Sequence, residues 1–173
     1  EKQEIVTGRT TFSLDEQIRQ AILLLEPLWE KKHLNLDIDL TACKFYGNCE
    51  MLQQVWINLL QNAIKFTPAG GEITIRASMD KDWLTVSFTD TGIGMTPEVK
   101  QRVFDKFYQG DTSHKKKGNG LGLALVRQIV TLYGGSVEVE SAPDMGSTFT
   151  VRLPAHTISS ESSSEQRALH SLP

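Results

Sequence analysis

One short segment combines residue types that suit recognition of a nucleotide base. DTGIGM, residues 90–95, comes directly after the alternating run LTVSFTD. The carboxylate of Asp90 can accept a hydrogen bond from an exocyclic amine, which would select adenine over guanine. Gly92 and Gly94 have no side chains, so the backbone there can approach a ligand closely. The segment therefore predicts a tight loop around a bound group.

Two further glycine-rich segments extend this pattern. GNGLGL, residues 118–123, is expected to open a helix, and the N–H groups of such a helix start suit phosphate binding. GSTF, residues 146–149, puts Thr148 on the final strand, where its hydroxyl is expected to support Asp90 or a bridging water. Each segment alone is a weak signal. GNGLGL follows a polar loop rather than a parallel strand, which argues against a dinucleotide-binding Rossmann loop.

A polar face on one expected helix is the other unusual feature. The segment EMLQQVWINLLQNAIKF is amphipathic, and at about 100° per residue Asn58, Asn62 and Lys65 fall within an arc of about 60°. Asparagine is a mediocre helix former because its amide competes for backbone hydrogen bonds. A solvated surface accounts for three such residues taken alone. Whether these three residues form a functional site depends on whether the glycine-rich segments lie beside them in the fold.

The elements that must position these residues follow from periodicity and caps. A strand before Ser13, a helix capped by Ser13 and Glu16, and a half-buried strand over residues 34–40 are expected first. Asn48 is expected to cap the amphipathic helix, which runs to Phe66. An alternating hairpin spans residues 72–90, a short helix follows Thr96, and a helix and two strands complete the order. This α+β order predicts a two-layer α/β sandwich, with helices on one face of a mixed sheet.

Length and composition are those of one globular domain with a tail. The chain has 173 residues, 39% of them hydrophobic, and a net charge of −3, which gives no support to nucleic-acid binding. Cys43 and Cys49 lack a metal-ligand spacing and are expected to be reduced thiols. Residues 155–173 are rich in serine and without periodicity, which predicts a disordered tail. The chain begins with Glu1, so we expect a fragment, and a membrane segment of the parent is left open.

Taken in order, five segments resemble the motifs of a known family. NLLQNAIKF, DTGIGM, FDKFY, GNGLGL and GSTF closely resemble the N, G1, F, G2 and G3 boxes of the catalytic ATP-binding domain of sensor histidine kinases. That domain belongs to the GHKL superfamily, with gyrase and the heat-shock chaperone ATPases, and has the Bergerat fold. The resemblance covers about residues 10–154. Residues 1–9 would then be the end of a connection from a dimerisation hairpin that carries the histidine.

The resemblance implies roles for individual residues. The position of Asn62 binds the Mg²⁺ that bridges the ATP phosphates, Asn58 lies beside it, and Lys65 reaches the phosphates. Phe66 packs on adenine, and Asp90 reads it. The other positions implied to bind nucleotide are Gly92, Ile93, Gly94, Met95, Phe107, Tyr108, Gly118, Gly120, Leu121, Gly122, Leu123 and Thr148.

Three departures bear on the chemistry. The gyrase-type ATPases have glutamate where Asn58 stands, and an amide cannot serve as a general base. The family often has arginine where this chain has Gln109, and Lys115, Lys116 or Lys117 is expected either to compensate or to be a solvated charge run. The four histidines, His33, His114, His156 and His170, lack the acidic neighbour of a phosphate acceptor and are expected to lie at the surface, with His33 at the beginning of the strand that follows it.

The resemblance therefore implies a cytoplasmic domain, of either a soluble or a membrane-anchored sensor, that binds ATP and Mg²⁺. Its γ-phosphate would go to a histidine on the separate hairpin and then to an aspartate of a response regulator. The fragment would be monomeric with little turnover, and the full kinase a homodimer. Two alternatives stay open: a serine kinase of the anti-sigma type, and a nucleotide-dependent interaction module with little catalysis.

Overall fold

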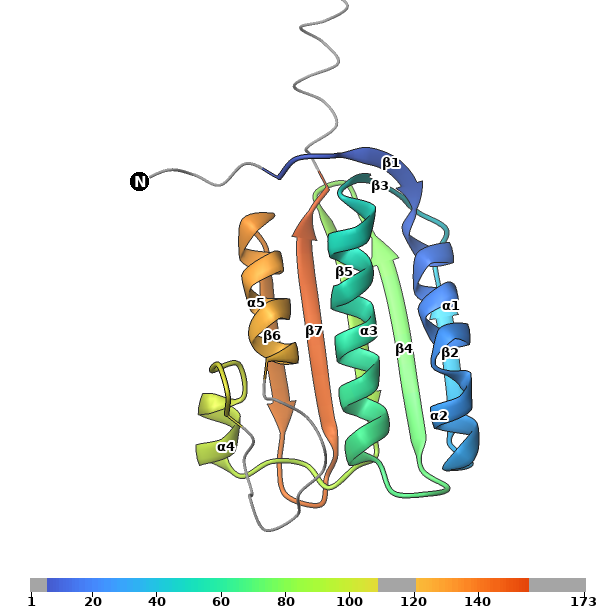
Figure 1. Ribbon diagram of the computed structural model, residues 1–173, viewed down its shortest axis with the longest axis vertical. Helices are drawn as coiled ribbons and strands as arrows, with labels where there is room; N and C mark the ends of the chain where they lie inside the picture. Colours follow the sequence, from blue (N-terminus) through green and yellow to red (C-terminus); the bar gives the residue numbers. More distant parts are fainter. Residues whose placement is uncertain (1–5, 109–120, 156–173) are drawn as a thin grey trace, which may run out of the picture.

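The computed structural model describes residues 6–108 and 121–155. It is a two-layer α/β sandwich in which α1, α3 and α5 cover one face of a five-stranded mixed sheet (Figure 1). The fold class expected from the sequence is confirmed. The elements in chain order are β1 (Thr10–Ser13), α1 (Leu14–Leu24), α2 (Glu26–Lys31), β2 (Asn35–Leu40), β3 (Lys44–Gly47), α3 (Cys49–Phe66), β4 (Glu72–Met79), β5 (Trp83–Asp90), α4 (Pro97–Arg102), α5 (Gly122–Leu132), β6 (Ser136–Ser141) and β7 (Ser147–Pro154).

The sheet has the strand order β2-β4-β5-β7-β6, and β1 pairs with β3 in a separate two-stranded sheet. β2 runs parallel to β4, whereas all other neighbours in the large sheet are antiparallel. The hairpin expected over residues 72–90 is the β4–β5 pair, with Ile73 opposite Asp90. No helix in the described part of the chain is long and apolar enough to cross a membrane.

Strand alternation decides which side chains reach the core. Leu84, Val86 and Phe88 of β5 are buried against the helices, and Asp90 continues the same row at the end of the strand. The indole of Trp56 is fully buried on α3 and stacks near Phe88, with ring centroids 6.4 Å apart. The row of buried side chains on β5 is therefore apolar except for the carboxylate at its end.

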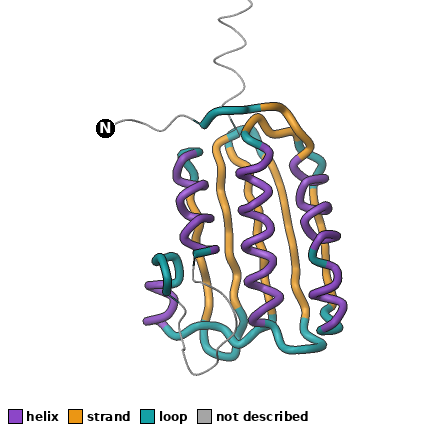
Figure 2. Tube along the Cα trace, in the orientation of Figure 1, coloured by secondary structure: helices purple, strands orange, loops and turns teal. Residues whose placement is uncertain are grey.

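Loops that follow α3 and β5, and the turn between β6 and β7, gather at one end of the sandwich (Figure 2). The first residues described, together with the end of β7, lie at the opposite end. The loop of residues 90–95, which is implied in ligand binding, therefore lies at the end of the domain opposite the entering chain. Val6 is nevertheless buried, and Asn48 Nδ2 donates to Thr7 O at 2.9 Å, so this entering segment packs on the domain.

Three local expectations need correction. The side chain of Ser13 makes no cap hydrogen bond; its hydroxyl accepts from Lys44 Nζ at 2.9 Å, so the capping box does not form. β2 is a largely exposed edge strand rather than a half-buried one, and Ile38 is 42% exposed. His33 lies in the turn before that strand at φ 51°, not in the strand. Both free cysteines are thiols, with Cys43 buried and Cys49 exposed.

Asn48 caps α3 as expected and also holds the entering segment. Its Oδ1 accepts from Met51 N at 3.0 Å, while its Nδ2 donates to Thr7 O. We expect Asn48→Ala to lower the free energy of unfolding by about 1–2 kcal/mol, because both contacts are lost. Asn48→Asp retains the cap acceptor and should lose less. Urea denaturation of the three proteins measures this, and an alanine variant as stable as wild type would contradict it.

Candidate functional site

Asp90 is a buried carboxylate at the end of β5. The residue is only 5% exposed, and its Oδ1 accepts a hydrogen bond from Gly92 N at 2.9 Å. Burial raises the pKa of Asp90, while hydrogen bonds from the backbone N–H groups of Gly92 and Ser147 lower it and only partly offset the burial. A carboxylate has about four lone-pair sites, so it retains acceptor capacity for an amine of a ligand.

The loop after Asp90 is wedged between α3 and the β6–β7 turn. Ile93 N donates to Phe66 O at 3.2 Å, and Asp144 N donates to Ile93 O at 2.7 Å. A Cβ on Gly92 would lie 2.5 Å from Phe66 O, so only glycine allows this approach. The tight loop expected from the sequence is therefore present, with Gly94 at φ 68°. Ile93 itself is 51% exposed.

The polar face of α3 adjoins the start of α5. Asn58 Nδ2 donates to Gln54 O at 2.7 Å, which leaves Oδ1 directed at α5, 2.7 Å from where a Cβ on Gly122 would stand. Asn58, Asn62 and Lys65 are all half-buried, and Lys65 Nζ lies 5.3 Å from the centroid of the Phe66 ring. The first turn of α5, the positive end of its dipole, is thus brought beside the asparagine face.

This arrangement predicts an unusual result for Gly122→Ala. Alanine in a helix normally stabilises relative to glycine by about 1 kcal/mol. Here its Cβ would displace the amide of Asn58, which can rotate away at little cost. We expect the thermal unfolding midpoint to stay the same or rise, while affinity for ATP falls several-fold. Differential scanning fluorimetry and calorimetric titration measure the two effects, and an unchanged affinity would show that Asn58 can move without consequence.

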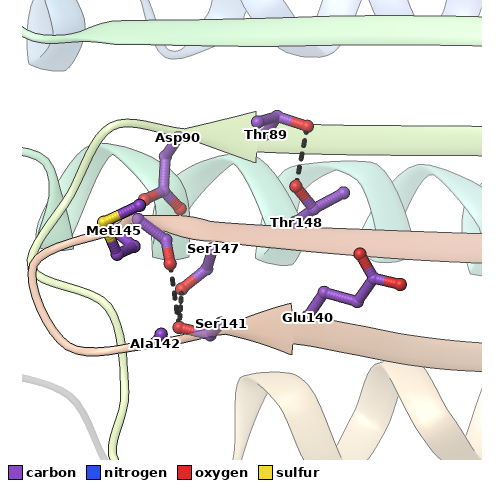
Figure 3. A pocket seen from close by; sticks show the side chains of 9 residues that line it. Thr89, Asp90, Glu140, Ser141, Ala142, Met145, Ser147 and Thr148 are labelled. Carbon is purple, nitrogen blue, oxygen red and sulfur yellow. Dashed lines mark hydrogen bonds between the residues drawn. The ribbon is translucent and has the colours of Figure 1, made fainter.

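Ser147, rather than Thr148, shares a sheet face with the Asp90 side chain. Ser147 pairs with Asp90 across β5 and β7 and is 8% exposed. Thr148 points to the uncovered face, where its hydroxyl hydrogen-bonds that of Thr89 at 3.0 Å (Figure 3). The expectation that the Thr148 hydroxyl supports Asp90 is therefore wrong. Alternation contained the signal, because Phe149, Val151 and Leu153 are the apolar residues of β7 and Ser147 is in phase with them.

A depression of about 250 Å³ opens at these strand ends (Figure 3). It is lined by the ends of β5, β6 and β7 and by the turn that contains Met145, which is 79% exposed. Because Thr89, Thr148 and Glu140 line it, the depression extends over the face of the sheet opposite α1, α3 and α5.

The two phenylalanines after α4 differ, because one packs against the sheet and the other is exposed. Phe104 packs on Phe149, with centroids 6.0 Å apart, whereas Phe107 is 71% exposed at φ 64°, a backbone region that aromatic residues rarely occupy. The guanidinium of Arg102 lies 4.5 Å from the Tyr108 ring centroid. Phe104 is therefore the one of these two phenylalanines that packs against the core.

Several expected residues fall outside the described part of the chain. They are Gln109, the lysines at 115–117, Gly118 and Gly120, together with the tail from residue 156. Leu121, Gly122 and Leu123 are described, at the beginning of α5. Ser147 and Ser141, which sequence reasoning did not single out, lie beside Asp90 and its loop, and both hydroxyls are hydrogen-bonded.

This geometry can be compared with known proteins. Residues 47–157, more than half of the chain, match the family model of the histidine kinase-, DNA gyrase B- and HSP90-like ATPases. The chain belongs to this family. It is 41% identical over 153 residues to the circadian input-output histidine kinase CikA of Thermosynechococcus vestitus, covering 85% of this chain and 21% of that one. It is 38% identical over 130 residues to the sensor histidine kinase RppB of Synechocystis, covering 73% and 29%.

Solved structures give the same assignment. The nucleotide-free catalytic domain of the histidine kinase ThkA superposes with a TM-score of 0.76 at 28% identity, covering 86% of this chain and 99% of that one. Full-length ShkA in complex with AMPPNP gives 0.77 at 27% identity, covering 87% and 32%. This chain is thus an ATP-binding domain of the histidine kinase type, and it spans about a fifth of the length of the circadian kinases that it matches.

Proposed function

We propose that this domain binds Mg·ATP and donates the γ-phosphate to a histidine on a separate helical hairpin of the same kinase. The phosphoryl group would then pass to an aspartate of a response regulator. The longer kinase would be a homodimer through that hairpin, and this domain alone a monomer. A structure of ThkA in complex with the response regulator TrrA, similar to this chain with a TM-score of 0.72 at 27% identity, supports such a partner.

The residues present fit ATP. Asp90 supplies a buried acceptor for the exocyclic amine of adenine, held by Gly92 N. Phe66 lies at the end of α3, where its backbone oxygen anchors the same loop, and Lys65 stands beside it for the phosphates. The close approach of α5 to α3 at Gly122 places helix N–H groups where an anion would be stabilised. These elements meet at one end of the sandwich.

The fit to Mg²⁺ rests on oxygen donors. An amide oxygen is a suitable hard ligand, and Mg²⁺ in phosphoryl-transfer sites is held by few protein ligands together with phosphates and waters. Asn62 lies one turn beyond Asn58 on the same half-buried face and is the residue we assign to this contact. When bound, Mg²⁺ neutralises charge that develops on the transferring phosphate.

One observation favours transfer over hydrolysis: the side chain facing the start of α5 is an amide. Asn58 has no group that could take a proton from water at neutral pH. One of its two amide hydrogens is donated to Gln54 O, and its oxygen is directed toward α5. The domain's own residues therefore bind and orient ATP, while the nucleophile comes from another domain.

Calorimetric titration with ATP and GTP in the presence of Mg²⁺, beside a phosphate-release assay, tests this proposal. We expect ATP to bind with micromolar-to-millimolar affinity, GTP to bind much more weakly, and the domain alone to release almost no phosphate. Equal affinity for the two nucleotides would contradict the role of Asp90. Rapid phosphate release would contradict the assignment of a nucleophile outside this domain.

A further inference from the structure

Three residues stand in one row across the end of the sheet. Ser141 is the last residue of β6 and pairs with Ser147, the first residue of β7, which in turn pairs with Asp90 of β5. All three point to the helix-covered face, because Asp90 and Ser147 are in phase with buried apolar residues of their strands and Ser141 with the partly buried Val137 and Val139. Figure 3 shows the hydroxyl of Ser141 directed at that of Ser147.

The hydroxyl of Ser141 uses its full hydrogen-bonding capacity. Its Oγ lies 2.8 Å from Met95 N, 2.9 Å from Gly146 O and 2.8 Å from Ser147 Oγ. The Met95 N–H can only donate and the Gly146 carbonyl can only accept. Ser141 must therefore accept from Met95 and donate to Gly146, and its second lone pair takes the proton of Ser147. One oxygen thus joins the Asp90 loop to the β6–β7 turn.

The loop and the turn meet backbone to backbone around this oxygen. Asp144 N donates to Ile93 O at 2.7 Å, and a Cβ on Gly94 would collide with the carbonyl of Ala142. Gly146, at φ 71°, lies against the carbonyl of Asp90 in the same manner. Among the described residues, two hydrogen bonds hold the loop here, from Asp144 N to Ile93 O and from Met95 N to Ser141 Oγ, beside the bond that Ser147 N–H donates to the Asp90 carboxylate.

We infer that Ser141 is a positioning residue for base recognition, acting on the Asp90 loop without touching the nucleotide. This inference rests on the proposed binding of ATP. Without the hydroxyl, the Met95 N–H loses its acceptor and the loop keeps a single tie to the turn. Gly92, which holds Asp90 Oδ1, is three residues from Met95 in that loop. The carboxylate would keep its hydrogen bond from Ser147 N–H, but its Oδ1 would be held less firmly in the orientation that meets an exocyclic amine.

Removal of one such hydrogen bond should weaken ADP binding by about tenfold. The variants are Ser141→Ala, Ser141→Thr, which retains the hydroxyl, and Ser87→Ala, a control on the opposite face of β5. Two quantities are measured: the dissociation constant for ADP by calorimetry, and the exchange rate of the Met95 amide proton by NMR without nucleotide. We expect loss of affinity and faster Met95 exchange in Ser141→Ala, and values near wild type in the other two.

Each outcome of these measurements bears either on the role of Ser141 or on the proposed function. Slow Met95 exchange in wild type is expected even if Ser141→Ala fails to fold, and fast exchange there would overturn the inference. Unchanged ADP affinity in a folded Ser141→Ala, with wild type binding ADP, would also overturn it. If wild type itself bound no ADP, the proposed function would fall instead. A tenfold loss shared by Ser87→Ala would show a general effect on the sheet and count against Ser141.

Discussion

Asp90→Asn is expected to lower affinity for ATP by about 10- to 100-fold while the domain stays folded. One carboxylate oxygen accepts from Gly92 N, and another acceptor is needed for the adenine amine. Asparagine has one oxygen and one NH₂ group, so a donor would face either the Gly92 N–H or the amine. Calorimetric titration with ATP measures the loss. Affinity equal to wild type would show that the buried carboxylate has no part in base recognition.

The same variant should be at least as stable as wild type, with a defined pH dependence. Burial raises the pKa of Asp90, so the ionised carboxylate destabilises the folded state at a pH above its raised pKa. That cost diminishes as the pH falls through the folded pKa and is absent below the unfolded one. The gain from Asp90→Asn in thermal midpoint should accordingly be largest near neutral pH and vanish in acid. A gain that grows on acidification would contradict the assignment.

Asn62→Ala is expected to reduce phosphotransfer by about 100-fold or more, because charge neutralisation at the transferring phosphate loses its anchor. The fold should tolerate the change, since Asn62 is only half-buried and alanine is the better helix former. ATP titrations with and without Mg²⁺ separate metal-dependent from base-dependent binding. Only the Mg²⁺-dependent part should fall.

Gln61 provides a matched control for this experiment. It is an exposed amide on the same helix, one residue away and on a different face. Gln61→Ala should retain both Mg²⁺-dependent affinity and phosphotransfer. If Asn62→Ala behaved like this control, Asn62 would not be the metal contact, and Asn58 would be the next residue on the face to test.

Strong periodic signals in the sequence predicted the elements that carry the site. The alternation of LTVSFTD located β5 and its terminal Asp90, and the cap at Asn48 and the end near Phe66 located α3. Those signals are local, and each is reinforced by burial of one face. They also sufficed for the fold class, since the order of helices and hairpins allows few ways to cover one sheet.

Two of the errors have a common physical cause, because residues distant in sequence decided the local environment. Ser13 fits a capping box, but Lys44 of the paired strand takes its hydroxyl. β2 alternates, yet its position at the sheet edge leaves Ile38 exposed. The expectation that the Thr148 hydroxyl supports Asp90 was instead an error of strand phase, because a shift of one residue moves a side chain to the opposite face.

The role inferred for Ser141 was beyond sequence reasoning for the same reason. Its hydroxyl contacts Met95, 46 residues away in the chain, across a turn and a loop whose shapes depend on glycines at positive φ. Periodicity places Ser141 at the end of a strand but does not reveal which backbone groups meet it there. Contacts of this kind between a loop and a turn can be predicted only when the register of the whole sheet is known.

Phosphotransfer in trans tests the central claim most directly. The domain would be incubated with γ-labelled ATP, Mg²⁺ and an isolated histidine-bearing hairpin of a related sensor kinase, with a hairpin lacking the histidine as control. We predict acid-labile label on the intact hairpin alone, abolished by Asp90→Asn and strongly reduced by Asn62→Ala. Label on neither hairpin, from a domain that binds ATP, would contradict the proposed transfer and favour a nucleotide-dependent interaction module.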